Sequence, residues 1–402
     1  MPSRPLRSNT STKDFLFVQS TTELGGAEIV LLNLLAGSEE LRRRSLVVSL
    51  GYGRGDLPRR LAGVGAEVVE MKAPRLRHFW RLVPTYRDLI GLAREAGVRA
   101  LVANGTHPQA VAGLAARLTG LKSVFWVHSI YREPLLHNDA PDVVALLHRC
   151  DLALTVSRAA QEVLGRLRPS VATRLLYNGT PSREVTPDEA RAARAELGAG
   201  EDDTLIGVFA RLQRGKGQDL FIEAARQIAP ERPRTRFVVV GGSEVAHEAD
   251  FLEEMKHAAA APELRGRLLL TGHRADVARL MAACDVVCHT SRAPESFGMV
   301  LIEAMVQARP VIATALGGPG EIIDSPDKGI VIPPDDAGAL ARAMLALIDD
   351  PARRHAMGAA GRAHAQARFS IDVMASTMIR YLDELLAGTG PEPRVTPRAS
   401  TG

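Results

Sequence analysis

Short apolar runs alternate with alanine-rich helical segments along nearly the whole chain, and no other feature restricts the fold as strongly. Runs such as residues 15–19 and 205–209 are apolar almost throughout, which is typical of strands buried on both faces. Helical patterns, among them residues 27–35 and 218–228, lie between these runs. This order of elements predicts an α/β fold in which helices cover both faces of parallel sheets.

The chain has 402 residues, too many for one hydrophobic core, so the alternation predicts two doubly wound domains. Strands are expected at 15–19, 45–50, 66–70, 100–103, 123–127 and 152–156, and then at 205–209, 236–240, 267–271, 286–289, 311–313 and 329–332. The turn sequence Asn178-Gly-Thr-Pro181 separates the two sets. We therefore expect an N-terminal domain over 1–185, a C-terminal domain over 186–369, a helix over 370–387 that packs back on the N-terminal domain, and a disordered tail over 388–402.

Composition favours a folded globular protein, with 46% hydrophobic and 24% charged residues. No run approaches the roughly 18 apolar residues of a membrane span, and no apolar signal core follows the polar N-terminus. The three cysteines lie in or beside apolar runs, so we expect buried free thiols and a reducing cytoplasm. A metal site made from Cys284, Cys288 and His289 is the alternative, although no second ligand pair is near in sequence.

Ligands of open parallel sheets bind beyond the carboxyl ends of the strands, so polar residues that follow a strand are candidates for a site. After the strand 286–289, Glu295 lies in a loop where a carboxylate could accept hydrogen bonds from sugar hydroxyls. Gly298 opens a helix whose free backbone N–H groups favour anions. Glu303 stands in the apolar sequence Met-Val-Leu-Ile-Glu-Ala-Met-Val and needs a partner if it is buried. A ribose diol would offer two donors, whereas a buried arginine or an exposed helix stripe would give Glu303 a structural role.

Three further strand ends carry candidate residues. Arg211 and Lys216 stand in the loop Phe-Ala-Arg-Leu-Gln-Arg-Gly-Lys after the strand 205–209, where two cations suit a pyrophosphate, or form a solvated basic loop. Gly25 and Gly26 follow the first strand and let the backbone approach a ligand, or simply make a strand–helix turn. His128 follows the strand 123–127, although an isolated histidine is more often structural than functional.

Together these motifs resemble the signature of the family 4 retaining glycosyltransferases, a group with the GT-B fold of two Rossmann-like doubly wound domains facing a central cleft. The resemblance extends over nearly the whole chain and includes Tyr177-Asn-Gly, Thr271-Gly-His, Gly317-Gly-Pro-Gly-Glu and Arg368-Phe-Ser. Ala210 stands where the family has glycine, and Ser129 stands where it often has aspartate.

The resemblance implies a role for each candidate residue. Arg211 and Lys216 would neutralise the leaving diphosphate, Glu295 and His128 would contact the donor sugar, and Glu303 would contact the nucleotide ribose. The remaining donor-binding residues implied in this way are Gly25 and Gly26 near the phosphates, Gly272 and His273 in the base-binding region, and Ser296, Phe297, Gly298 and Met299, whose backbone amides would hold the sugar and phosphates.

The reaction implied is transfer of a sugar, with retention, from a nucleotide diphosphate sugar held by the C-terminal domain to a glycan or lipid-linked acceptor held by the N-terminal domain, in glycan, polysaccharide or glycolipid biosynthesis. No essential metal and no other cofactor are expected, because the two cations of the Arg211–Lys216 loop stabilise the leaving group. Nucleic acid is not expected as a partner. The alternatives are a GT-B-fold sugar-nucleotide epimerase or phosphorylase, and a non-catalytic sugar-nucleotide-binding protein.

The charge is distributed unevenly along the chain. Residues 1–185 contain 25 Lys and Arg against 16 Asp and Glu, a net +9, whereas residues 186–402 contain 25 against 30, a net −5. The basic and aromatic run 75–82, with Arg42, Arg43 and Arg44, would suit an anionic membrane surface. The alternative is that Phe79 and Trp80 are core or acceptor-site residues. We expect a cytoplasmic protein, peripheral on the inner face of the membrane if the first interpretation holds.

Overall fold

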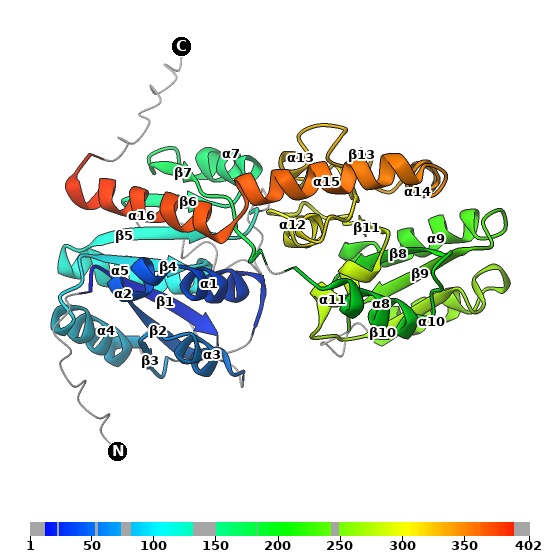
Figure 1. Ribbon diagram of the computed structural model, residues 1–402. Helices are drawn as coiled ribbons and strands as arrows, with labels where there is room; N and C mark the ends of the chain where they lie inside the picture. The colour runs from blue at the N-terminus through cyan, green and yellow to red at the C-terminus, as the bar shows by residue number, and fades with distance from the viewer. Residues whose placement is uncertain are drawn as a thin grey trace, which may run out of the picture. The chain divides into compact units, whose positions relative to one another are not determined.

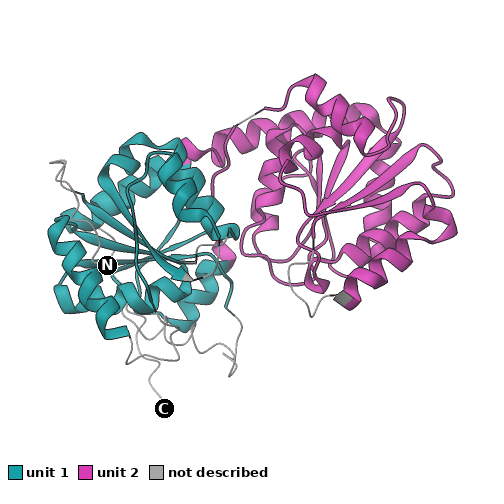
Figure 2. Ribbon diagram, turned by 90° about the horizontal axis from the view of Figure 1, so that it is seen from below, with its two compact units in different colours: residues 1–156, 160–176, 374–402 teal, residues 157–159, 177–373 magenta. Residues whose placement is uncertain are grey.

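The computed structural model describes residues 13–21, 24–52, 55–73, 82–131, 150–182, 184–242 and 249–389. The chain divides into two compact units, each an open parallel sheet with helices on both faces (Figure 1). Unit 1 comprises residues 1–156, 160–176 and 374–402, and unit 2 comprises residues 157–159 and 177–373 (Figure 2). The predicted α/β class with two doubly wound domains is confirmed.

The sheet of unit 1 places its first and fourth strands side by side. Its strands are β1 (Phe15–Thr21), β2 (Ser45–Tyr52), β3 (Val68–Glu70), β4 (Ala100–Asn104), β5 (Lys122–Val127), β6 (Leu152–Thr155) and β7 (Thr173–Leu175). They lie in the order β3-β2-β1-β4-β5-β6-β7, and all neighbours are parallel. Because the strand order reverses between β1 and β4, this is the switch point at which such sheets bind ligands.

Helices bury both faces of this sheet, which explains why its strands are apolar without alternation. The helices of unit 1 are α1 (Gly26–Gly37), α2 (Glu39–Arg44), α3 (Leu57–Gly63), α4 (Val83–Glu95), α5 (Thr106–Thr119), most of α7 (Arg158–Leu167) and most of α16 (Ile371–Ala387). Leu16 and Val18 of β1 belong to a core cluster with residues of α4 and α5. Phe15 and Phe17 alternate with them along β1 and are equally inaccessible to solvent.

The last helix, α16, is attached to the rest of unit 1 by polar contacts with β7 and with the end of α2. The Tyr381 hydroxyl donates to a backbone carbonyl of β7 at 3.3 Å, and Glu384 pairs with Arg174 of β7 at 3.3 Å. Asp383 forms a two-pronged ion pair with Arg44 at the end of α2, with a shortest distance of 2.5 Å. Residues almost 340 positions apart in the chain therefore share one folded unit.

Unit 2 repeats the same construction with six strands. These are β8 (Thr204–Phe209), β9 (Thr235–Val240), β10 (Leu268–Gly272), β11 (Val286–His289), β12 (Val311–Thr314) and β13 (Ile330–Ile332). Their order is β10-β9-β8-β11-β12-β13, with every pair parallel. The switch point lies between β8 and β11, the two strands at the centre of the sheet.

Helices again cover both faces of the sheet. They are α8 (Pro187–Glu196), α9 (Gln218–Ile228), α10 (Ala249–Ala259), α11 (Val277–Ala283), α12 (Met299–Val306), α13 (Pro319–Ile322), α14 (Ala337–Ile348) and α15 (Pro351–Arg368), with short 3-10 turns η3 (Arg214–Lys216) and η5 (Pro262–Leu264). The main core cluster joins Ile206 and Val208 of β8 to Phe221 of α9 and Met344 of α14. Gly207 lies between those two strand residues, where Phe209 and Cys284 leave no room for a side chain.

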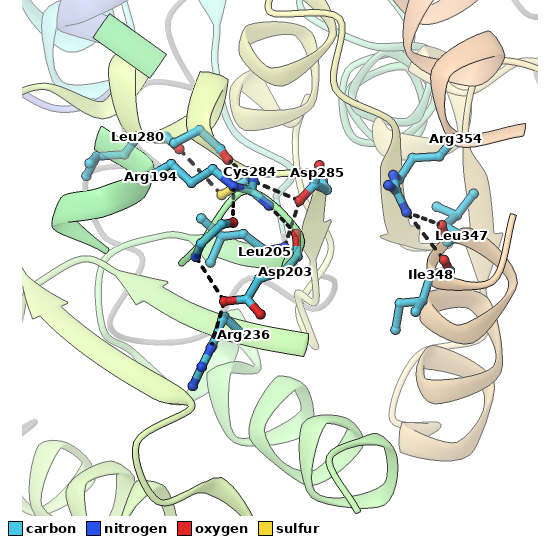
Figure 3. A network of polar contacts seen from close by, with 12 residues as sticks. Arg194, Asp203, Leu205, Arg236, Leu280, Cys284, Asp285, Leu347, Ile348 and Arg354 are labelled. Carbon is cyan, nitrogen blue, oxygen red and sulfur yellow. Dashed lines mark hydrogen bonds and ion pairs between the residues drawn. The ribbon is translucent and has the colours of Figure 1, made fainter. Parts of the chain in front are cut away.

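A polar network holds the amino ends of the two central strands together (Figure 3). Arg194 of α8 donates from Nη1 to the Ala283 carbonyl and to Asp285 Oδ2, both at 2.9 Å. The same Asp285 oxygen accepts from the backbone N–H of Leu205 at 2.8 Å, and the Asp203 carbonyl accepts from Arg194 Nη2. Since both charged side chains are mostly buried and fully engaged, the pair sets the register between β8 and β11, whose opposite ends carry the candidate site.

Candidate functional site

The predicted residues of the C-terminal half gather at the switch point of unit 2. Arg211 and Lys216 lie in the loop that follows β8, and Glu295 lies in the loop that follows β11, the neighbouring strand. Two cations and a carboxylate are therefore placed at the carboxyl ends of the two central strands.

A tight approach between the two loops shapes the Lys216 side of this site. Gly217 has φ +67° and ends the η3 turn in the left-handed region. A Cβ atom at this position would overlap the Thr290 carbonyl, so only glycine allows the contact. The Thr290 hydroxyl in turn donates to the Lys216 carbonyl at 2.9 Å. The loop after β8 is thus held directly against the end of β11.

Lys216, Glu295 and His289 form a compact polar cluster. Glu295 Oε2 lies 2.5 Å from Lys216 Nζ and 3.5 Å from His289 Nε2. Burial works against the charged form of Glu295, but the hydrogen bond from His289 and the positive charge of Lys216 outweigh it and hold the pKa of this carboxyl at about 2. The cluster keeps Glu295 a carboxylate, the form in which both oxygens accept hydrogen bonds and neither donates.

The backbone of Glu295 is secured by the glycine-rich segment after β12. Its N–H donates to the Leu316 carbonyl at 3.1 Å, and its carbonyl accepts from the Gly318 N–H at 2.8 Å. These bonds make an isolated parallel bridge between Glu295 and Gly317. Gly318 has no space for a side chain, because a Cβ atom there would meet the Phe297 backbone. The glycines of this motif therefore position the carboxylate loop.

Arg211 contrasts with Lys216, because its side chain is exposed and makes no hydrogen bond or ion pair with any residue that the structure describes. Its carbonyl accepts from Gln218 Nε2 at 2.8 Å, so the backbone is fixed while the guanidinium is left available. Gly272 and His273 are also exposed and lie at the end of β10, two strands away from β8. The Gly272 carbonyl accepts from Gly241 at 3.0 Å.

The segment Ser296–Met299 leads from the carboxylate loop into α12. Phe297 is buried and its ring lies 5.9 Å from Tyr177 and 5.7 Å from Phe369, so its side chain belongs to the core of unit 2. Gly298 has φ +105° and is the residue that precedes the helix. Only backbone groups of Phe297 and Gly298 are therefore available to a ligand, and the first N–H groups of α12 are of the kind that bind anions.

Glu303 lies one turn further along α12 and differs sharply from Glu295. It is mostly buried, and its carboxylate has no hydrogen-bond or ion-pair partner among residues 13–389 as far as the structure describes them. Burial raises the pKa of Glu303 to about 7. The buried arginine that would give this residue a structural role is therefore absent from the described surroundings, and a buried carboxylate without a donor is costly.

In unit 1, the predicted residues lie around the other switch point. Gly25 and Gly26 form the turn between β1 and α1, and Glu28 accepts from the Gly25 N–H at 3.1 Å to cap the helix. His128 follows β5, and its Nε2 lies 2.7 Å from Asn104 Oδ1 at the end of β4. Burial lowers the pKa of His128 to about 3, so this ring is neutral at physiological pH.

Two family models match the chain, one on each side of its middle. Glycosyltransferase Family 4 matches residues 24–183, and Glycosyl transferases group 1 matches residues 189–364. The chain belongs to family 4 of the GT-B glycosyltransferases.

Named relatives and solved structures agree with this membership. The chain is 32% identical over 204 residues to a GDP-mannose-dependent monoacylated alpha-(1-6)-phosphatidylinositol monomannoside mannosyltransferase of Corynebacterium glutamicum. The aligned residues make up 49% of this chain and 52% of that relative, so the match spans about half of each protein. It is 27% identical to a D-inositol 3-phosphate glycosyltransferase of Stackebrandtia nassauensis over 86% of this chain and 78% of the relative. The crystal structure of Anabaena HepE in complex with UDP matches this chain with a TM-score of 0.81 at 26% identity, and the match covers 92% of this chain and 100% of the HepE chain.

Several polar residues of the glycosyltransferase lie at the switch points although no sequence motif assigned them a site role. His289 entered the sequence analysis only as a metal ligand with Cys284 and Cys288, yet both cysteines are buried free thiols, as is Cys150. Within the described part of the chain, no three His, Cys, Asp or Glu side chains converge as a metal site would require. Gln19 and Asn104 are buried polar residues inside apolar strands, and that contrast was the signal available to find them.

The structure bears only partly on the predicted membrane surface of the glycosyltransferase. Of the run 75–82, all but Leu82 lies outside the described residues, and Leu82 is buried. In the second cluster, Arg44 is mostly buried in ion pairs with Asp14 and Asp383, and Arg42 donates to the Leu35 carbonyl. In the described ranges, no helix has the length and apolarity needed to cross a membrane.

Proposed function

We propose that this glycosyltransferase moves a sugar, with retention at the anomeric carbon, from a nucleotide diphosphate sugar to a hydroxyl of a glycan or lipid-linked acceptor. The observation that carries the proposal is the arrangement at the switch point of unit 2. Two cations, Arg211 and Lys216, follow β8, and two carboxylates, one ion-paired and one buried without a described partner, lie just before and within α12. Each group matches one part of a nucleotide diphosphate sugar.

The two cations suit the diphosphate. Arg211 offers a planar fork of donors that no described residue occupies, and Lys216 offers a compact charge 2.5 Å from Glu295. A diphosphate carries more negative charge than one carboxylate and would compete with Glu295 for Lys216. The N–H groups at the start of α12 would add neutral donors for the same oxygens.

The two carboxylates suit the two hydroxyl-bearing parts of the donor. Glu303 is mostly buried and lacks a partner among the described residues, so a ribose diol would supply two donors to a group that is costly to leave unpaired. Glu295 is held as an anion by Lys216 and His289 and would accept from hydroxyls of the transferred sugar.

The chemistry requires a stabilised leaving group more than a strong base. In the proposed step, the bond between the anomeric carbon and the diphosphate oxygen breaks, and a bond to the acceptor oxygen forms on the same face of the sugar. The acceptor proton passes to the departing phosphate oxygen. Arg211 and Lys216 stabilise the charge that develops on the diphosphate, so we propose that the reaction needs no divalent metal.

The acceptor and the cellular location form the less specific part of the proposal. Relatives are named for phosphatidylinositol mannoside and inositol phosphate acceptors, and the basic N-terminal half, with a net +9 over residues 1–185, suits a phosphate-bearing acceptor. We propose a cytoplasmic enzyme that meets such acceptors at the inner face of the membrane.

Transfer itself is the test. Purified full-length protein is incubated with a panel of UDP- and GDP-sugars, first with water and then with candidate acceptors, and release of the nucleoside diphosphate is measured with and without EDTA. Release from one donor, increased by an acceptor and insensitive to EDTA, supports the proposal. Complete loss with EDTA that Mg²⁺ or Mn²⁺ restores would refute the metal-free mechanism, and conversion of the donor to an epimer without release would refute transfer.

A further inference from the structure

Four polar side chains of unit 1 form a continuous hydrogen-bonded chain across the switch point of its sheet. Gln19 Nε2 of β1 lies 2.6 Å from Glu28 Oε1 of α1, Asn104 Nδ2 of β4 lies 2.5 Å from Gln19 Oε1, and His128 Nε2 lies 2.7 Å from Asn104 Oδ1. Gln19 is 0% and Asn104 2% exposed. Two amides buried this deeply inside apolar strands are costly unless their hydrogen bonds are satisfied, so the chain is a specific feature of this sheet.

The direction of each hydrogen bond follows from groups that can only accept. Glu28 ends the chain as a carboxylate, so Gln19 must turn its nitrogen to Glu28 and its oxygen to Asn104. The Ala27 carbonyl also only accepts and lies 3.3 Å from Asn104 Nδ2, so it independently turns the Asn104 nitrogen away from the histidine. The Asn104 oxygen therefore faces His128, and His128 Nε2 must carry the hydrogen.

A neutral imidazole carries one proton, so a hydrogen on Nε2 leaves Nδ1 as a bare acceptor. No described residue bonds to Nδ1. The ring is also restrained from one side by Trp126, whose ring centre lies 4.6 Å away. The hydrogen-bonded chain thus determines both the orientation of His128 and the chemical character of its free nitrogen.

We propose that Glu28, Gln19 and Asn104 are positioning residues that lock His128 as its Nε2–H tautomer, so that Nδ1 accepts a hydrogen bond from a hydroxyl of a substrate sugar. The identity of that hydroxyl rests on the proposed glycosyl transfer, whereas the tautomer does not. In this role His128 is a fixed acceptor that discriminates between sugars with and without the hydroxyl, and it neither donates nor removes a proton during the reaction.

Nitrogen NMR of the full-length protein labelled with ¹⁵N-histidine tests the tautomer directly, with His128→Gln used to assign the signal. The expected spectrum shows a protonated Nε2 and an unprotonated Nδ1 for His128 at neutral pH. A proton on Nδ1, or equal populations of the two tautomers, would overturn the proposal. This measurement is independent of activity, so it stands even if the enzyme transfers no sugar under the conditions chosen.

Gln19→Leu breaks the chain, and Gln109→Leu is its matched control. Gln109 is also 0% exposed in unit 1, but neither polar atom of its side-chain amide has a partner in the part of the chain that the structure describes. In Gln19→Leu, we expect Asn104 to lose its fixed orientation, His128 to populate both tautomers, and kcat/KM to fall about tenfold, the scale of one hydrogen bond. Gln109→Leu should change neither the tautomer of His128 nor kcat/KM.

Deoxy sugars then separate positioning from general stability. The wild type should discriminate against the one deoxy substrate that lacks the Nδ1 partner, and Gln19→Leu should lose most of this discrimination while still transferring the remaining sugars. If Gln19→Leu and Gln109→Leu lower activity equally on every sugar, the chain serves only to hold the sheet together.

Discussion

The Glu303 carboxylate, which has no partner among the described residues, should make nucleotide binding depend on pH. Burial raises the pKa of Glu303 to about 7 from an ordinary value of 4.5. A ribose diol can donate to both carboxyl oxygens at once only when Glu303 is ionised, so binding should release a proton below this pKa. At pH 6 about one molecule in ten carries the ionised carboxylate, and the affinity for a nucleoside diphosphate should be about tenfold lower than at pH 8.

Calorimetry with two nucleotides isolates this effect. The phosphates of the ligand titrate in the same range, so the nucleoside diphosphate is compared with its 2′,3′-dideoxy analogue, which has the same phosphates and no diol. The wild type should show the extra pH dependence with the diol only, and Glu303→Gln should show it with neither ligand.

The same substitution should act with opposite sign on the free protein. A buried acid whose pKa is raised binds protons more tightly in the native state than in the unfolded state, so its effect is absent below about pH 4.5 and destabilising above about pH 7. The shift corresponds to about 3 kcal/mol. Glu303→Gln should therefore stabilise the ligand-free protein at pH 8 by up to that amount in denaturant unfolding, with no gain at pH 4.5. Equal pH dependence with both nucleotides, together with unchanged stability, would refute the assignment of Glu303 to the ribose.

Four further substitutions test other contacts. Lys216→Ala and Arg211→Ala should each lower turnover at least about a hundredfold, the scale of a lost transition-state contact, and near-normal steady-state rates in both would remove the diphosphate assignment. Glu295→Ala should weaken binding of the sugar nucleotide but leave the free diphosphate largely unaffected in calorimetry; a parallel loss of both affinities would argue against a sugar contact. Asp383→Asn should lower the free energy of unfolding by about 1 kcal/mol through its ion pair with Arg44, and an unchanged denaturation midpoint would mean that this pair is not stabilising.

Local pattern was enough to predict nearly every strand, because strands buried on both faces appear as continuous apolar runs. All twelve predicted strands are present, and the helix predicted at 218–228 has the same bounds as α9. The strand that the pattern missed is β7, Thr173–Leu175. It has three partly buried residues with Arg174 at the centre, and it exists through pairing with β6 and contact with α16, neither of which a local pattern contains.

The candidate site, too, could be predicted only in part from the sequence. Single residues such as Arg211 and Glu303 could be proposed because each follows a strand or interrupts an apolar helix. The contacts between site residues could not be predicted in this way. Lys216 and Glu295 are 79 positions apart in the chain and come together only because β8 and β11 are neighbours in the sheet. The hydrogen bonds that join Glu28, Gln19, Asn104 and His128 were missed for this reason as well. His128 could be singled out because it follows a strand, but its partners come from β1, α1 and β4, and only the fold brings them together.

The discontinuity of unit 1 has a consequence for how the protein is made. Its sheet is translated before unit 2, but α16, whose Asp383 and Glu384 pair with Arg44 and Arg174, is translated after unit 2. The surface of nascent unit 1 that α16 covers therefore stays exposed while residues 177–373, which make up nearly all of unit 2, are synthesised. A stop codon near residue 370 would remove no strand from the sheet of either unit, yet it would destabilise unit 1, whose sheet is synthesised before unit 2.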